Sequence, residues 1–470
     1  MSAPSDARFA TVFDRDLVAK YDAPTPRYTS YPTAPQFEPG FDAAALRRVL
    51  EETNAASAPA PPLSLYFHLP FCEELCLFCG CNVTIARDRS RAATYAEDLA
   101  REMDLVAPLV RKDRRVEQLH WGGGTPTFFP PDVLKRLFES VRARFAFAPA
   151  AEIGVEVDPR ETTDAHLEAL AACGFNRLSM GIQDFDPRVQ AAVKRIQPED
   201  MTRRTVEKAR ELAFESVNVD LIYGLPHQSL ASFEITVDAV LRLRPDRIAL
   251  FNFAYLPDML RHQKTIEPAA MPDADEKLRI LQMAVARFAD AGFEFVGMDH
   301  FARPEDELCR ALRAGTLHRN FQGYTTKAGL DMLSFGVSAI AQVGRAYAQN
   351  VKDVPGWTAA VRAGSLPVAR GRILTDDDVV RRDAIMRLMC RFALAKREVE
   401  SAHRIPSFDE YFADSLAALR PLEADGLVVT TPDAVTVTPR GRFLVRVVAA
   451  RFDAYLASGG GEKKRFSRAI

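Results

Sequence analysis

Four of the seven cysteines in this chain, Cys72, Cys76, Cys79 and Cys81, fall within ten residues. Thiols this crowded cannot all pair as ordinary disulfides without strain, so they indicate a metal site. A structural zinc site usually takes two cysteine pairs separated by a dozen or more residues, and no second pair follows here. Spacings of three and two residues in one short loop therefore favour an iron–sulfur cluster over zinc.

Three of these thiols suffice for a four-iron cluster with one open iron. Cys81 lies only two residues after Cys79, so both are poorly placed to bind different corners of one cube. We expect Cys72, Cys76 and Cys79 to bind three irons, which leaves the fourth open for catalysis. Cys81 is then either a thiol near the substrate, the reading we favour, or a small residue without chemistry.

Glycines and carboxylates follow the predicted strands of the same region. Gly122–Gly124 come directly after a predicted strand at 116–121, where the backbone must bend sharply or approach a ligand closely. Backbone groups freed there are suited to the ammonium and carboxylate of an amino acid. Glu156 and Asp220 end two other predicted strands, and a carboxylate at such a strand end can accept both hydroxyls of a ribose.

The elements that position these residues alternate along the chain. Predicted strands cover 64–69, 116–121, 152–157, 176–182, 216–222, 247–253 and 293–298. Helical periodicity appears at Tyr95, Leu99, Met103 and Val106, at Leu134, Leu137, Phe138, Val141 and Phe145, and at Leu278, Leu281, Val285 and Phe288, where Gly292 ends the helix. Strands that alternate with amphipathic helices predict an α/β fold with a parallel sheet, either a full or partial TIM-type barrel or a doubly wound sheet.

Four parts follow from this pattern. A Pro-rich extension with a short helix around 43–54 covers 1–62, the α/β barrel covers 63–300, and a barrel-closing, active-site segment covers 301–360. A mostly helical domain covers 361–470: Thr375 and Asp378 open a helix through Cys390, and further helices are expected near 408–419 and 440–455. With its β-ribbon around 427–438 it resembles a winged-helix fold.

Composition excludes several classes of protein. The 470 residues carry a formal net charge of −2, which argues against a nucleic-acid binder. No run of about 18 apolar residues predicts a membrane span, and the mixed-charge N-terminus is unlike a secretory signal. With cysteines gathered for a metal rather than for bridges, we expect a cytoplasmic protein.

Several motifs carry a resemblance to a known family. The run Cys72-x3-Cys76-x2-Cys79 after the first strand of an α/β repeat resembles the signature of radical S-adenosylmethionine (SAM) enzymes, and HWGGGTP at 120–126 resembles their glycine motif. With EVDPRE, NRLSMGIQDF, DLIYGLP, GMDHFARPEDEL and HRNFQGYTT, the chain is similar along nearly its whole length to the oxygen-independent coproporphyrinogen III oxidase family.

The resemblance implies a cluster, two SAM molecules and a set of residues for each. The metal ligands are Cys72, Cys76 and Cys79, and Tyr66 and Cys81 are expected as catalytic residues. The first SAM would use Tyr66, Gly123 and Glu156. The second would use Phe78, Gly124, Thr125, Gln183, Arg195, Asp220, Ala254 and Ile340.

The implied reaction converts coproporphyrinogen III to protoporphyrinogen IX. A 5′-deoxyadenosyl radical derived from SAM removes a β-hydrogen from a propionate, and loss of carbon dioxide and one electron leaves a vinyl group, on two rings in turn. The electron would come from a reductant such as a flavodoxin, and we expect a monomer. The four carboxylates of the substrate suggest arginines around it, and Arg27, Arg303 and Arg319 lie in motif-rich segments. His68, His300 and His318 are candidates of the same standing.

Three rival interpretations stay open. A haem chaperone related to this family typically lacks the fourth cysteine and carries a His-Asn-x-x-Tyr-Trp motif, whereas this chain has Cys81 and reads HRNFQGYT at 318–325. A radical methyltransferase or cyclopropane-forming enzyme on the same scaffold would make a methylated or cyclised product. A zinc protein without redox chemistry would be colourless when prepared without oxygen.

Overall fold

The computed structural model describes residues 11–55, 60–457, 466 and 468. They belong to two compact units, each assembled from separate stretches of the chain. Unit 1 draws on residues 1–36, 273–328 and 374–470, and unit 2 on residues 37–272 and 329–373. The four-part division expected from the sequence remains a prediction.

Unit 2 is built on seven parallel strands that lie in the order β13-β1-β4-β5-β6-β7-β8. Their bounds are β1 (Leu63–Leu69), β4 (Val116–Gly123), β5 (Phe147–Val157), β6 (Arg177–Gln183), β7 (Ser216–Tyr223), β8 (Arg247–Asn252) and β13 (Asp331–Phe335). From β4 to β8 the spatial order follows the chain order, as in a barrel, and does not reverse as in a doubly wound sheet. The prediction of a barrel-type α/β fold is therefore confirmed.

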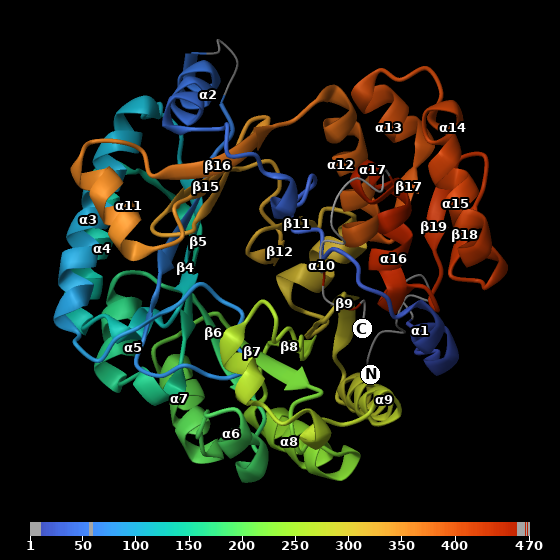
Figure 1. Cartoon of the computed structure of the whole chain (residues 1–470), viewed down its shortest axis with the longest axis horizontal. Coiled ribbons are helices and arrows are strands. Elements are labelled where there is room, and N and C mark those ends of the chain that lie inside the picture. Colours follow the sequence, from blue (N-terminus) through green and yellow to red (C-terminus); the bar gives the residue numbers. More distant parts are fainter. Residues whose placement is uncertain (1–10, 56–59, 458–465, 467, 469–470) are drawn as a thin grey trace. The chain divides into compact units, whose positions relative to one another are not determined.

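Helices connect these strands and cover one side of them. They are α3 (Ser90–Val106), α4 (Pro131–Arg144), α5 (Asp164–Ala172), α6 (Pro187–Ala192), α7 (Glu199–Glu211) and α8 (Leu230–Leu243). In Figure 1, α3, α4, α5, α7 and α8 follow one another around the outside of the strands. The apolar faces predicted for 95–106 and 134–145 are buried, so helical periodicity identified the helix surfaces that face the sheet.

Three antiparallel strands extend the sheet of unit 2 beyond β13. They are β14 (Ile340–Val343), β15 (Ala346–Asn350) and β16 (Val368–Ile373), each paired with its neighbour. The other elements of this unit are α2 (Ala43–Ala55), β2 (Phe71–Cys72), β3 (Thr84–Ile85) and α11 (Val354–Arg362), with short 3-10 helices at Ala107–Leu109, Pro126–Phe128, Pro159–Glu161, Arg261–Thr265 and Pro268–Ala270.

Unit 1 is mostly helical. Its helices are α1 (Arg15–Tyr21), α9 (Ala274–Asp290), α10 (Glu307–Ala314), α12 (Asp376–Arg391), α13 (Lys396–His403), α14 (Phe408–Tyr411), α15 (Ala413–Ala424), α16 (Val445–Ala449) and α17 (Ala454–Ala457), with 3-10 turns at Ala34–Gln36, Arg442–Leu444 and Ala450–Phe452. Its strands are β9 (Glu294–Gly297), β10 (His300–Ala302), β11 (His318–Asn320), β12 (Gly323–Thr325), β17 (Ala393–Ala395), β18 (Val428–Thr430) and β19 (Ala434–Val437). The capping box of Thr375 and Asp378 forms as predicted and begins α12.

Three expectations for unit 1 were wrong in detail. The strand expected at 293–298 is β9, which pairs antiparallel with β10 rather than extending the parallel repeat. The helix expected near 408–419 is interrupted at Phe412, whose φ of −108° lies outside the helical range. The continuous helix expected at 440–455 is instead a short α-helix between two 3-10 turns.

Arg446, in α16, forms hydrogen bonds with residues 25 and 26 and with Arg468. Its Nε donates to the carbonyl of Pro26 at 3.2 Å, its Nη1 to the carbonyl of Arg468 at 3.1 Å, and its Nη2 to the carbonyl of Thr25. The side chain is buried, so carbonyl oxygens, rather than water, satisfy the guanidinium.

Among the described residues, no helix is long and apolar enough to cross a membrane.

Candidate active site

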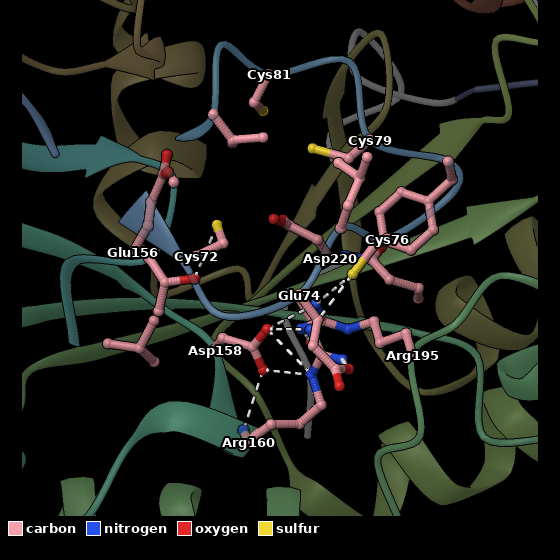
Figure 2. Close-up of a pocket in the computed structure, with 18 of the residues that line it drawn as sticks. Cys72, Glu74, Cys76, Cys79, Cys81, Glu156, Asp158, Arg160, Arg195 and Asp220 are labelled. Carbon is pink, nitrogen blue, oxygen red and sulfur yellow. Dashed lines mark hydrogen bonds and ion pairs between the residues drawn. The ribbon is translucent and has the colours of Figure 1, made fainter. Parts of the chain in front are cut away.

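A pocket of about 730 Å³, a volume that includes its open mouth, lies in unit 2 at the carboxyl ends of the parallel strands. This is the end of a barrel at which ligands bind. It brings together twelve of the fifteen site residues predicted from the sequence: Cys72, Cys76, Cys79, Cys81, Phe78, Gly123, Gly124, Thr125, Glu156, Gln183, Arg195 and Asp220. Figure 2 shows the four cysteines around this pocket together with Glu156 and Asp220.

Three predicted residues do not line this pocket. The ring of Tyr66 stacks on His120, and its hydroxyl lies 3.1 Å from Nδ1 of His68. The carbonyl of Ala254 accepts a hydrogen bond from Gln263, and the carbonyl of Ile340 accepts one from Ser334. His68 also lies 2.8 Å from the carbonyl of Asn82 through Nε2, so its two ring nitrogens have protein partners.

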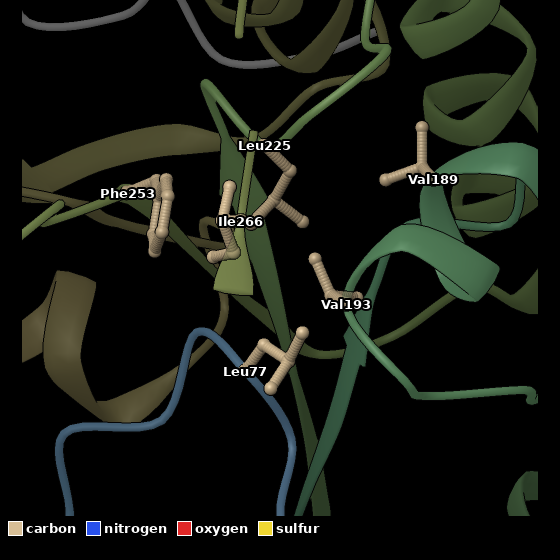
Figure 3. Close-up of a cluster of buried hydrophobic side chains, with 6 residues drawn as sticks. All are labelled: Leu77, Val189, Val193, Leu225, Phe253 and Ile266. Carbon is tan, nitrogen blue, oxygen red and sulfur yellow. The ribbon is translucent and has the colours of Figure 1, made fainter. Parts of the chain in front are cut away.

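The cysteine loop is fixed to the protein through its main chain. Cys79 donates its N–H to the carbonyl of Cys76 at 3.1 Å, which forms a turn, and Nε2 of His262 lies 2.8 Å from the carbonyl of Cys79. Between them, Leu77 enters a buried hydrophobic cluster, whose members are Leu77, Val189, Val193, Leu225, Phe253 and Ile266 (Figure 3). The side chains of Cys76 and Cys79 are thus presented by a loop whose middle residue is buried.

Each of the three expected metal ligands has a different side-chain neighbour. Sγ of Cys72 lies 3.3 Å from the hydroxyl of Thr125, and burial raises the pKa of Cys72 to about 12. A hydrogen bond from the Cys81 thiol lowers the pKa of Cys79. Sγ of Cys76 accepts from Nη2 of Arg160 at 3.3 Å.

The three glycines make room for other parts of the protein. A Cβ on Gly122 would lie 2.7 Å from the Glu156 carboxylate, and one on Gly124 would lie 2.6 Å from the Pro70 backbone. Gly123 has φ +111°, which favours glycine, and its N–H donates to Glu156. The N–H groups of Gly124 and Thr125 donate to the carbonyls of Leu69 and Phe71. The N–H groups of Gly123, Gly124 and Thr125 thus have protein acceptors, which contradicts the expectation that they bind the carboxylate of an amino acid. The expectation that backbone groups here bind its ammonium remains a prediction.

The two predicted ribose-binding carboxylates differ in charge. Confinement alone would raise the pKa of Glu156, but its hydrogen bond to His120 and the charge of that ring outweigh this and lower it. Burial raises the pKa of Asp220 to about 7, and the negative charge of Glu156 acts in the same direction, against a hydrogen bond from Asn218. Near neutral pH, Glu156 is ionised while Asp220 is partly protonated.

The donor set fits an iron–sulfur cluster and SAM better than a single metal ion. Among the described residues, no three His, Cys, Asp or Glu side chains are close enough together to hold one ion. In a cluster each thiolate binds its own iron, so three separated thiols on one pocket wall are suitable, and coordination itself deprotonates them. Gln183 lines the same pocket, and its Oε1 is buried without a hydrogen-bond partner in the described part of the chain. A donor group on a bound ligand would satisfy it.

Two arginines beside the cysteines share one carboxylate. Arg195, predicted from the sequence, donates to Oδ2 of Asp158 at 2.9 Å, and Arg160 donates to the same oxygen at 2.7 Å. Sequence reasoning missed Arg160 and Asp158 as site residues, although both stand in the EVDPRE motif. Nothing in the motif itself marks Arg160, and only the fold shows that this arginine reaches a cysteine.

Comparisons with known proteins agree along the whole chain. Residues 66–240 match the Radical SAM superfamily model, and residues 374–444 match the HemN C-terminal domain model. The chain is 45% identical to the oxygen-independent coproporphyrinogen III oxidase of Synechocystis sp., over 98% of this chain and 99% of that protein, and 46% identical to that of Salmonella typhimurium, over 97% and 98%.

A solved structure shares this fold. It is the coproporphyrinogen III oxidase (HemN) from Escherichia coli, described as a radical SAM enzyme. The TM-score is 0.89 at 44% sequence identity, and the match covers 95% of this chain and 100% of the other.

Proposed function

Because this chain belongs to the family of oxygen-independent coproporphyrinogen III oxidases in the radical SAM superfamily, we propose that it oxidatively decarboxylates two propionates of coproporphyrinogen III. The product is protoporphyrinogen IX. The observation that carries this proposal is one pocket that unites twelve of the fifteen expected site residues, the four cysteines among them. A family resemblance alone would not require them to meet.

Cys72, Cys76 and Cys79 hold the [4Fe–4S] cluster. When bound, the cluster and SAM supply the one-electron chemistry that generates a 5′-deoxyadenosyl radical. The protein positions the thiols of Cys76 and Cys79 through the buried Leu77 and the turn from Cys76 to Cys79. Cys81 lines the pocket beside Cys79 without being needed as a fourth ligand, so its thiol is available to the substrate.

The SAM-binding residues surround this loop. Glu156 accepts ribose hydroxyls of the first SAM, with Gly123 and Tyr66 beside it, and Asp220 serves the second. The remaining residues of the second site are Phe78, Gly124, Thr125, Gln183, Arg195, Ala254 and Ile340. Support comes from the unsatisfied Oε1 of Gln183 and from the pocket that Phe78, Gly124, Thr125 and Arg195 line together.

Arg319 is the best candidate to bind a substrate carboxylate among the three arginines expected from the sequence. Arg27 is paired with Asp299, and Arg303 stacks on Phe293 and donates to the carbonyl of Ala291. Arg319 is buried, and among the described residues its Nε and Nη1 have no hydrogen-bond partner. A buried guanidinium without an acceptor is costly, and a carboxylate is its strongest partner.

The proposal also covers the electron donor, the oligomeric state and the cellular compartment. The electron donor is a flavodoxin-type protein, and the enzyme works as a monomer in the cytoplasm. All seven cysteines are free, which supports a reducing compartment.

The test is an oxygen-free assay of reconstituted protein with coproporphyrinogen III, SAM and a strong reductant. We expect carbon dioxide, 5′-deoxyadenosine and protoporphyrinogen IX, with two decarboxylations per substrate, and no turnover by Cys76→Ser. Haem binding without a vinyl product would instead identify a haem chaperone. S-adenosylhomocysteine with a methylated product would identify a methyltransferase.

A further inference from the structure

Cys76 differs from the other two expected ligands in its hydrogen-bond contacts with positively charged side chains, whereas Cys79 experiences the charge of Arg195 without such a contact. Nη2 of Arg160 lies 3.3 Å from its sulfur, and Nη1 of Arg195 lies 3.6 Å from it, as the dashed lines in Figure 2 show. Cys72 contacts the neutral hydroxyl of Thr125 instead. The charge near the three sulfurs is therefore uneven and concentrated on one side of the loop.

Asp158 fixes the guanidinium of Arg160 in this position. Nη2 of Arg160 donates to Oδ2 of Asp158 at 2.7 Å, and its Nε lies 3.1 Å from Oδ1. Both residues flank Pro159 in a tight segment, Asp158 being the N-cap of a 3-10 helix. The Arg160 side chain is 14% exposed, so it has little freedom to turn into solvent.

The three groups carry a net positive charge. Burial alone would raise the pKa of Asp158, but the charges of Arg195 and Arg160 outweigh burial and lower it, so its carboxylate is ionised. Asp158 compensates one of the two guanidiniums. Oε2 of Glu74 lies 3.7 Å from Nη1 of Arg160, but the Glu74 side chain is 69% exposed, so water screens its charge and a positive charge remains next to the sulfur of Cys76. Within a pocket, such a charge acts more strongly than it would in water.

We propose that Arg160 is a positioning residue that raises the reduction potential of the cluster bound through Cys76. Reduction adds a negative charge to the cluster, and a hydrogen bond and a positive charge at a ligating sulfur stabilise the reduced form most. In this role Arg160 acts through Cys76. The inference rests on the cluster of the proposed function and is independent of the substrate.

The test compares midpoint potentials of reconstituted proteins, measured by redox titration followed by electron paramagnetic resonance without SAM or substrate. Arg160→Met removes one positive charge and shifts the potential to more negative values. Asp158→Asn removes the compensating negative charge and shifts it to more positive values. Arg160→Lys, which keeps the charge but loses the planar fork, falls between Arg160→Met and the unmodified protein.

Arg144→Met is the matched control. Arg144 forms a two-bond ion pair with Asp104, at 2.8 and 2.9 Å, and contacts no cysteine, so its loss leaves the potential unchanged. An unchanged potential in Arg160→Met overturns the inference, as does an equal shift in Arg144→Met. If Arg160→Met fails to hold iron, the midpoint potentials of Arg160→Lys and Asp158→Asn test the inference instead. A midpoint potential of Asp158→Asn that is more negative than that of the unmodified protein overturns the inference. Because no substrate is present, failure of the decarboxylation assay leaves this result unaffected.

Discussion

Leu77 donates its backbone N–H to the carbonyl of Val193 at 2.9 Å, and both side chains belong to one buried cluster. One residue thus links the cysteine loop to the segment that follows α6 by a hydrogen bond and by apolar contact. Since Leu77 stands between Cys76 and Cys79, its position determines how far apart the two thiols are held.

Leu77→Ala should loosen this loop. A buried leucine replaced by alanine costs about 2–5 kcal/mol, because apolar contact is lost and a cavity remains. We expect a lower unfolding temperature and less iron retained per chain after gel filtration without oxygen. Ile196→Ala is the control, since this side chain is largely exposed, at 58%, and its loss should change neither quantity. Full iron content in Leu77→Ala would contradict an anchoring role.

Cys81→Ser should separate cluster binding from turnover. Three other cysteines suffice as ligands, so iron and sulfide content should match the unmodified protein, whereas Cys76→Ser should lose the cluster. Decarboxylation by Cys81→Ser should fall roughly 100-fold or more, the scale of a lost proton-transfer group. Loss of iron from Cys81→Ser would instead make Cys81 a ligand.

SAM binding should depend on pH through Asp220, whose pKa is about 7. An ionised carboxylate accepts both ribose hydroxyls, so affinity at the second site should rise between pH 6 and pH 8. The stability of the ligand-free protein should change in the opposite direction. The folded chain binds the proton of Asp220 more tightly than the unfolded chain does, so the contribution of Asp220 to the free energy of unfolding declines as pH rises through 7.

Equilibrium dialysis of SAM against the cluster-loaded protein measures the number bound at each pH. Asp220→Asn should bind the second SAM weakly and without this dependence on pH. The charged groups that act on Asp220 are Glu156 and Arg195, so a shift that persists in Asp220→Asn would assign the titration to another group.

Arg319→Met should weaken substrate binding without destabilising the fold. A charged hydrogen bond contributes about 1.5–3 kcal/mol, so the Kd of coproporphyrin III, a stable oxidised analogue, should rise about 10- to 150-fold. The unfolding temperature of the ligand-free protein should stay equal or rise, because a buried charge without an acceptor is removed. Porphyrin fluorescence and a thermal scan measure the two quantities.

A merely structural role for Arg319 predicts a different pattern. Its guanidinium lies 4.7 Å from the ring centre of Tyr324, and loss of this contact alone would lower the unfolding temperature and leave the Kd unchanged. Arg313→Met, which removes an ion pair with Glu294 on the same unit, provides the comparison.

Patterns with a strong local cause could be predicted from the sequence. The capping box at Thr375 depends on two residues three apart, and the buried faces of α3 and α4 depend on helical periodicity. The cysteine spacing was informative for the same reason. Strands β14 to β16 escaped prediction because they are short and pair antiparallel, and a half-buried Arg370 and a glycine at 371 interrupt the apolar pattern of the last one.

Residues that work through distant partners could not be predicted in this way. Arg160 acquires its contact with Cys76, 84 residues away, only when the barrel brings two strand ends together. The glycine motif was recognised, but the acceptors of its N–H groups, which are Glu156 and the carbonyls of Leu69 and Phe71, come from other parts of the chain. Spacing along a chain carries no information about such partners.

The three carbonyls gathered by Arg446 have a consequence for biosynthesis. Two belong to residues 25 and 26, and one belongs to Arg468. The segment at 25 and 26 therefore has these contacts only after Arg446, 420 residues after Pro26, has been made. A nascent chain stalled before residue 446 would leave that segment without its anchor and open to proteases.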